Sequence, residues 1–270
     1  MNSFKNLRDT INKKYRALEE LELIGDFISQ KHSLDNIKVN TEPFEYVVLD
    51  DFLSPRAYEE VCNFFDKVKD RGVVETRDDD RLHPFLDVEY PYDGYVKSVF
   101  PFESFVADTF YTNSWNLYFS ELFNRPTNMA TSVAFHFHPP HDKTGWVHSD
   151  YSNKKFSSKN VIWNGTIPHK RYKDVSQVDT ISKRAIALIY YFSNDLDTKD
   201  GGGTGLYAGL KDTSPTIVVE PKNNRLLAFS VSPRSYHAFQ KNLKDRRSMV
   251  QWFHIDEQWC KDNLENKNAK

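Results

Sequence analysis

The chain has 270 residues, with 39% hydrophobic and 27% charged residues and a formal net charge of −2. These values are ordinary for a globular domain, and the length is enough to bury a substantial core. The near-neutral charge gives no general attraction to nucleic acid or to an anionic membrane surface. No apolar run approaches the length of a membrane span. We therefore expect neither a nucleic-acid nor a membrane partner.

The two cysteines, Cys62 and Cys260, lie far apart and in no metal-ligand spacing. Two reduced thiols are typical of a cytoplasmic protein, and the N-terminus has no apolar signal core. The expected location is therefore the cytoplasm. Nothing in the sequence indicates an oligomeric state.

The first half of the chain favours helices. Apolar residues recur at helical spacing over residues 4–30, and again over 102–123. Residues 44–49 are β-branched and aromatic, which predicts a strand, and Ser54-Pro55 then begins a helix over 56–68. Residues 71–101 are charged and rich in proline, so they predict an irregular loop or a short hairpin.

From residue 129 onward the pattern changes to short strands separated by turns. The predicted strands are 133–139, 184–192, 205–209, 216–220, 225–231, 237–240 and 248–255. Many short strands at regular spacing are typical of a sandwich or a jelly roll. We expect one domain over 1–270 that is mainly β with added helices: helical support and an N-terminal strand in 1–125, and a jelly-roll core in 129–256.

One short motif suggests a metal site. In His148-Ser149-Asp150, residues two apart on an extended segment point to the same side, so both can bind one ion. His237 supplies a third ligand at the start of a predicted strand. Two histidines and one carboxylate form a facial triad with open positions, typical of non-haem Fe(II) oxygenases. The His-x-Asp spacing also occurs at His254–Asp256, but no histidine follows it.

Arg246 and Ser248 strengthen this interpretation. Arg246 follows His237 by nine residues, and a hairpin would bring the two strands to the same site. 2-Oxoglutarate needs an open metal edge for its keto-acid end and a cation for its distal carboxylate. Arginine offers a planar two-pronged donor for such a carboxylate. Ser248, two residues on, faces the same side and can add a hydroxyl donor.

The combined pattern resembles the prolyl-4-hydroxylase-like branch of the Fe(II)/2-oxoglutarate-dependent dioxygenases. The pattern comprises HSD at 148–150, RAIALIYYF at 184–192, and His237, Arg246 and Trp252 at the family's spacing. The resemblance implies a double-stranded β-helix, a cupin-like jelly roll with supporting N-terminal helices. It implies that His148, Asp150 and His237 bind Fe(II), that Arg246 binds 2-oxoglutarate, and that Tyr191 also contacts this cosubstrate.

Two features depart from the family. Relatives often carry a tyrosine about ten residues before the first metal histidine, where this chain has Phe137-His138. His136, His138 and His141 precede the motif and could line the substrate cleft, compete as ligands, or be ordinary strand and loop residues. The second departure is the long insertion 151–183. It holds seven Lys/Arg and two acids, and it is either a lid over a polar or anionic substrate or a solvated insertion.

The predicted function is Fe(II)/2-oxoglutarate- and O2-dependent hydroxylation of an unactivated C–H bond, releasing succinate and CO2. We expect a small polar substrate: an amino acid, a sugar derivative or a natural-product intermediate. A prolyl or other protein side chain is the alternative, as the resemblance suggests. A non-catalytic cupin-like module that binds a metal or a sugar is a further alternative, and a zinc hydrolase is the least favoured.

Overall fold

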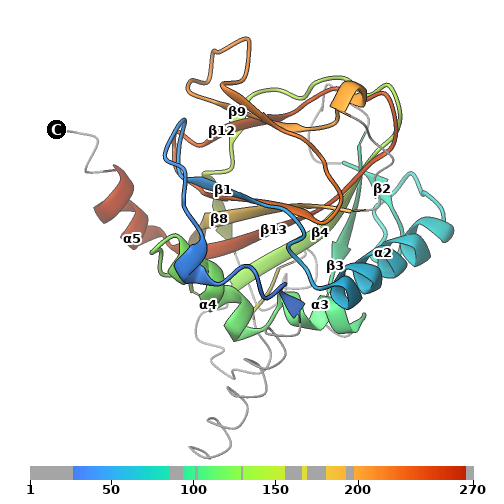
Figure 1. Ribbon diagram of the computed structural model, residues 1–270, viewed down its shortest axis with the longest axis horizontal. Coiled ribbons are helices and arrows are strands. Elements are labelled where there is room, and N and C mark those ends of the chain that lie inside the picture. The colour runs from blue at the N-terminus through green and yellow to red at the C-terminus, as the bar shows by residue number, and fades with distance from the viewer. Residues whose placement is uncertain are drawn as a thin grey trace, which may run out of the picture.

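The strands form two antiparallel sheets that face each other. The computed structural model describes residues 27–85, 94–100, 103–128, 130–155, 166–168, 181–192 and 198–265. The larger sheet has the order β1-β11-β8-β13-β4-β3-β2, with β6 also paired to β8 and β7 to β4. The smaller sheet has the order β10-β9-β12-β5 and lies above the larger one in Figure 1. This is the expected jelly roll.

The strands are β1 (Tyr46–Leu49), β2 (His83–Pro84), β3 (Tyr95–Val99), β4 (Ala130–His138), β5 (His148–Ser149), β6 (Asn153–Lys155), β7 (Thr166–Pro168), β8 (Ile181–Tyr191), β9 (Thr204–Tyr207), β10 (Ile217–Val219), β11 (Arg225–Ser230), β12 (Tyr236–Phe239) and β13 (Arg246–Asp256). The helices are η1 (Leu34–Asn36), α2 (Pro55–Asp70), α3 (Phe105–Phe110), α4 (Asn113–Leu122), η3 (Thr198–Asp200), α5 (Glu257–Cys260) and η4 (Lys261–Glu265).

Helices α2, α3 and α4 cover the outer face of the larger sheet, below it in Figure 1. Phe65 of α2 packs edge-on against Phe135 of β4, with ring centroids 5.3 Å apart. Phe119 of α4 stacks on Phe253 of β13 at 5.6 Å. The main hydrophobic core therefore lies between the helices and the sheet, and it leaves the space between the two sheets for a second, smaller core.

The predicted helix over 102–123 is two helices, so that prediction was wrong in one respect. Ser104 caps α3 by accepting a hydrogen bond from the Ala107 amide. Thr112 caps α4 by accepting one from the Trp115 amide at 3.2 Å. A hydroxyl at a helix N-terminus satisfies an amide that has no partner within the helix. Thr112 therefore starts a new helix inside the apolar pattern.

The seven strands predicted beyond residue 129 are all present with shifted ends, and the helix predicted over 56–68 is α2. The strand predicted over 44–49 is β1. For residues 71–101 the sequence predicted either an irregular loop or a short hairpin. The segment contains β2 and β3, which pair with each other in antiparallel fashion, as in the second alternative. The helix predicted over 4–30 lies almost wholly outside the described residues.

The expected hairpin between the strands of His237 and Arg246 is not formed. β12 belongs to the smaller sheet and β13 to the larger one, so the chain crosses from one sheet to the other over residues 240–245. The two strands still approach each other because the sheets face each other. Sequence periodicity identifies the strands but not the sheet to which each belongs.

Most of the insertion 151–183 lies outside the described residues, so the lid remains a prediction. Its described parts include β6, which pairs with β8, and β7, which pairs with β4. These pairings extend the larger sheet.

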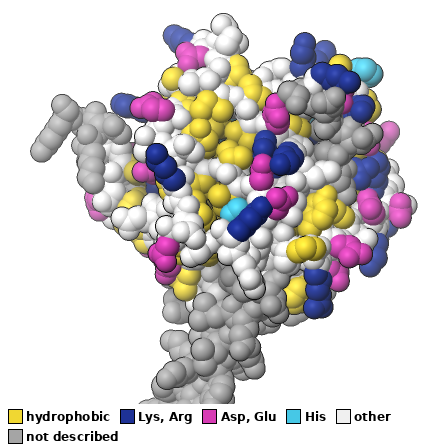
Figure 2. Space-filling view, viewed as in Figure 1, with side chains coloured by type: hydrophobic (Ala, Val, Ile, Leu, Met, Phe, Trp, Pro, Cys, Tyr) yellow, Lys and Arg dark blue, Asp and Glu magenta, His cyan; other side chains and the backbone are white. Residues whose placement is uncertain are grey.

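The described surface carries charges of both signs. Figure 2 shows lysine and arginine side chains interspersed with acidic ones on the face viewed there. Within the described residues, no helix combines the length and apolar character that crossing a membrane requires. Cys62 and Cys260 are both free thiols.

Candidate functional site

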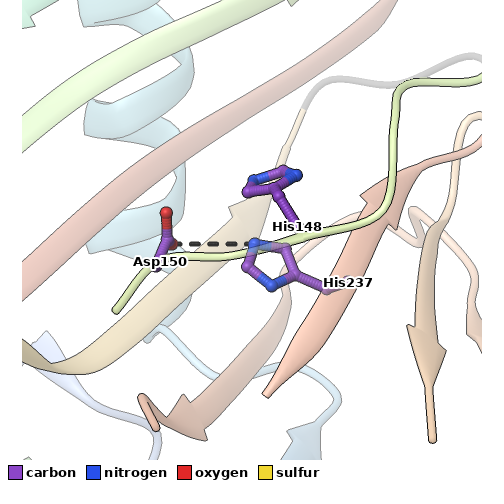
Figure 3. Close-up of side chains that lie close together, drawn as sticks. All are labelled: His148, Asp150 and His237. Carbon is purple, nitrogen blue, oxygen red and sulfur yellow. Dashed lines mark ion pairs between the residues drawn. The ribbon is translucent and has the colours of Figure 1, made fainter. Parts of the chain in front are cut away.

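His148, Asp150 and His237 come together between the two sheets. His148 on β5 is the direct cross-strand neighbour of His237 on β12, and Asp150 follows β5. The two imidazole centroids are 4.5 Å apart, and Nε2 of His237 lies 3.6 Å from Oδ2 of Asp150. One ligand atom from each residue lies within 4.8 Å of the others. Figure 3 shows the three side chains lying close together, with a dashed line for the ion pair between His237 and Asp150.

Backbone carbonyls orient both histidines. Nδ1 of His148 lies 3.0 Å from the carbonyl oxygen of Trp146, and Nδ1 of His237 lies 3.1 Å from that of Ser235. Because a carbonyl oxygen only accepts, Nδ1 is the donating nitrogen of each ring. Nε2 is then the atom with the free lone pair, as in most histidine metal sites.

The protonation states also suit a cation. Burial and the neighbouring His148 lower the pKa of His237 to about 4, so its ring is neutral at pH 7. Burial would raise the pKa of Asp150, but Arg184, His237 and His148 outweigh this effect and lower it below its usual range. Asp150 is therefore an anion. A neutral imidazole and a carboxylate anion are the forms that bind metals.

Both oxygens of Asp150 accept hydrogen bonds from residues of the larger sheet. Nη1 of Arg184 donates to Oδ1 at 2.6 Å, and Nε1 of Trp252 donates to Oδ2 at 2.6 Å. The Arg184 guanidinium carbon also lies 4.0 Å from the centroid of the Trp252 ring, in a cation–π contact. The Asp150 carboxylate is thus fixed by two donors, the Arg184 guanidinium and the Trp252 indole, which stack on each other.

An irregularity in the sheet explains why sequence reasoning missed Arg184. Phe253 of β13 pairs with Ile186 of β8, but His254 pairs with Arg184, so Ala185 is an extra residue on β8. Such a bulge reverses the alternation of side chains beyond it. Strict alternation would place Arg184 on the helix-covered face; the bulge turns it to the inner face. An arginine 34 residues after Asp150 gives no sequence signal for this contact.

Arg246 and its neighbours form a second group on the same inner face. The Arg246 guanidinium carbon lies 5.2 Å from the ring centroids of both Tyr191 and Phe239, and its Nε donates to the carbonyl of Gly202. Ser248 is the cross-strand neighbour of Tyr191. Its hydroxyl is buried and has no hydrogen-bond partner among the described residues. The Tyr191 hydroxyl pairs with Thr204 at 2.6 Å.

The structure connects this group to the three candidate ligands. Phe239, which contacts Arg246, lies two residues after His237 on β12 and so faces the same side. His136 on β4 interacts electrostatically with Arg246 of this group and with Asp150 of the candidate ligands. Burial, then the charges of His138 and Arg246, lower its pKa well below 6.5, while Asp150 acts on it in the opposite direction.

The other histidines do not join the three candidate ligands in the described part of the chain. His138 is the cross-strand neighbour of Arg246; it stacks on Phe239 at 4.1 Å and its Nδ1 lies 3.1 Å from Asp142. His141 lies in a loop with a positive φ of 66°. His254, of the second His-x-Asp spacing, is buried in β13.

Residues 147–254 match the sequence model of the 2OG-Fe(II) oxygenase superfamily. This segment belongs to that superfamily. The protein is therefore a 2-oxoglutarate-dependent dioxygenase, and it uses Fe(II), 2-oxoglutarate and O2. The reading as a metal- or sugar-binding module without catalysis is set aside.

Solved structures support the fold of the oxygenase. A prolyl-4-hydroxylase from Pseudomonas putida is 14% identical, with a TM-score of 0.54 over 77% of this chain and 91% of its own. A prolyl hydroxylase from Trichoplax adhaerens, solved with a hypoxia inducible factor peptide fragment, is also 14% identical. Its TM-score is 0.51 over 90% of this chain and 94% of its own. No protein with curated annotation matches the sequence.

Proposed function

We propose that the oxygenase binds Fe(II) through His148, Asp150 and His237. The observation that carries this assignment is the convergence of their ligand atoms within 4.8 Å. The chemistry of the donors supports it, because two imidazoles and one carboxylate leave positions open for a cosubstrate and for O2. The bound metal, with 2-oxoglutarate and O2, supplies the oxidising power that converts a C–H bond to C–OH and yields succinate and CO2.

We assign the distal carboxylate of 2-oxoglutarate to Arg246 and Ser248, with Tyr191 beside them. A buried hydroxyl without a partner costs free energy unless a ligand satisfies it, and the Ser248 hydroxyl is one. Arg246 supplies the positive charge next to it. Phe239 and Tyr191 flank the guanidinium and keep water from its faces.

The substrate that we propose to test first is a prolyl residue in a peptide. Its support is the pair of similar structures above, both prolyl hydroxylases by name. The small polar molecule expected from the sequence rested on the near-neutral charge and on the insertion 151–183. The comparisons give it no preference, so it is the second candidate.

Succinate formation tests the proposal. The Fe(II)-loaded oxygenase is incubated with 2-oxoglutarate and O2, together with either proline-containing peptides or a panel of amino acids and sugar derivatives. We expect a compound in one of the two panels to raise succinate formation above the uncoupled rate. The hydroxylated product of that compound should be 16 Da heavier than the compound itself. His237→Ala should form no succinate with any panel. A variant as active as the wild type would contradict the ligand assignment.

A further inference from the structure

Arg184 and Trp252 lie beside the proposed iron ligand Asp150 but are not themselves proposed ligands. We propose that Arg184 and Trp252 are positioning residues, which present Asp150 to the metal through one oxygen, Oδ2. This proposal rests on the proposed function. Trp252 fixes the direction of Oδ2, and Arg184 keeps Oδ1 away from the metal.

The contacts assign a different task to each oxygen. Oδ2 is the oxygen 3.6 Å from Nε2 of His237, so it faces the other ligands. An oxygen with two lone pairs can accept from the Trp252 indole and still bind a cation. Oδ1 accepts the Arg184 guanidinium at 2.6 Å in a largely buried ion pair. A metal bound through both oxygens would lie beside the Arg184 guanidinium, and the two positive charges would repel each other.

The backbone is built to hold this arrangement. The extra residue Ala185 in β8 turns Arg184 to the inner face, where it stacks on Trp252. Bulges are often found next to active sites, where they re-aim a side chain. The contact between Arg184 and Trp252 fixes each donor through the other, so the two act as a unit.

This arrangement affects the cosubstrate. If a metal held here took six ligands, three single-atom protein ligands would leave three positions, enough for a chelating 2-oxo acid and for O2. A carboxylate that bound through both oxygens would fill one of these positions. Keeping Oδ1 on Arg184 therefore preserves the space that the cosubstrate needs.

The test compares two variants with two matched controls. Trp252→Phe keeps an aromatic ring but removes the indole N–H donor, and Arg184→Gln removes the guanidinium. Trp115→Phe removes a different buried indole donor, which donates to Gln251 at 2.9 Å in the core between the helices and the larger sheet. Arg225→Gln removes a different arginine–aspartate pair, with Asp50. Arg184→Lys tests whether charge alone restores function.

The readouts are anaerobic titration with Co(II) and with Fe(II), followed by addition of 2-oxoglutarate. We expect Trp252→Phe to weaken metal binding about 10- to 100-fold. For Arg184→Gln we expect a smaller change in metal affinity but at least about a tenfold loss of 2-oxoglutarate affinity in the metal-loaded protein. Its visible spectrum with Co(II) should also change, because the coordination of the metal changes. Arg184→Lys should restore only part of the loss.

Two results would overturn the proposal. In one, both variants bind metal and 2-oxoglutarate within twofold of the wild type. In the other, they lose thermal stability as Trp115→Phe does, but with no specific loss of metal or cosubstrate affinity, which marks a merely structural role. A wild type that binds no 2-oxoglutarate would instead count against the proposed function.

Discussion

Arg246 and Arg247 are adjacent in sequence but point to opposite faces of β13. Arg246 lies on the inner face against Phe239, whereas Arg247 lies over Phe65 of the helical layer and pairs with Asp66. Only Arg246 is placed to meet a ligand between the sheets. The two residues therefore form a natural pair of test and control.

Replacing Arg246 by glutamine should weaken 2-oxoglutarate binding. A charge-assisted hydrogen bond contributes about 1.5–3 kcal/mol, which corresponds to about a 10- to 150-fold increase in Kd. Arg247→Gln should leave this Kd within about twofold. Calorimetric titration of the metal-loaded oxygenase measures both values, and an equal effect of the two substitutions would refute the assignment of Arg246.

The spacing of residues in the sequence was sufficient to find the three candidate ligands. Alternation along an extended segment puts His148 and Asp150 on the same side, and His237, at the start of a later predicted strand, was the third candidate. Arg184 could not be found in this way, because its contact with Asp150 depends on a bulge that the amino-acid pattern does not reveal. Trp252 belongs to the family pattern, but its spacing does not show that its indole donates to Asp150.

Helices α3 and α4 provide a test at the scale of the element. The Thr112 hydroxyl accepts from the Trp115 amide and donates to the Thr109 carbonyl, so it joins the two helices. Thr112→Ala should lower the free energy of unfolding by about 1 kcal/mol or slightly more. Urea denaturation measures the loss. Thr213→Ala, at an exposed loop position, should change stability by less than about 0.5 kcal/mol.

If Thr112→Ala were no less stable than Thr213→Ala, the cap would not determine where α4 begins. The apolar pattern over 102–123 predicted helix correctly, because aromatic anchors recur at helical spacing throughout. It could not reveal the interruption, because a capping threonine inside such a pattern also suits a helix surface. The capping contact becomes visible only in three dimensions.

At the scale of the whole molecule, the candidate site joins the two sheets. β5 and β12 of the smaller sheet carry His148 and His237, and the larger sheet holds Asp150 through Arg184 and Trp252. The sequence predicted a jelly roll because its strands are short and evenly spaced. It did not predict how the strands divide between the sheets, since inward-facing residues alternate in the same way in both.

Metal binding should therefore stabilise the whole fold. A ligand present at about 100 times its Kd adds about 2.7 kcal/mol if it binds only the native state. We expect Co(II) to raise the melting temperature of the oxygenase and a chelator to reverse the gain. His237→Ala should show no such gain, whereas a metal-dependent gain of the same size in this variant would place the ion elsewhere.

The most direct test of the account is anaerobic reconstitution with Fe(II) and 2-oxoglutarate, followed by visible absorption. A 2-oxo acid that chelates Fe(II) gives a weak metal-to-ligand charge-transfer band. We predict this band in the wild type and its loss in His148→Ala and Asp150→Ala. A folded, metal-loaded wild type without the band, or a band that persists in both variants, would contradict the proposal that His148, Asp150 and His237 hold the iron to which the cosubstrate binds.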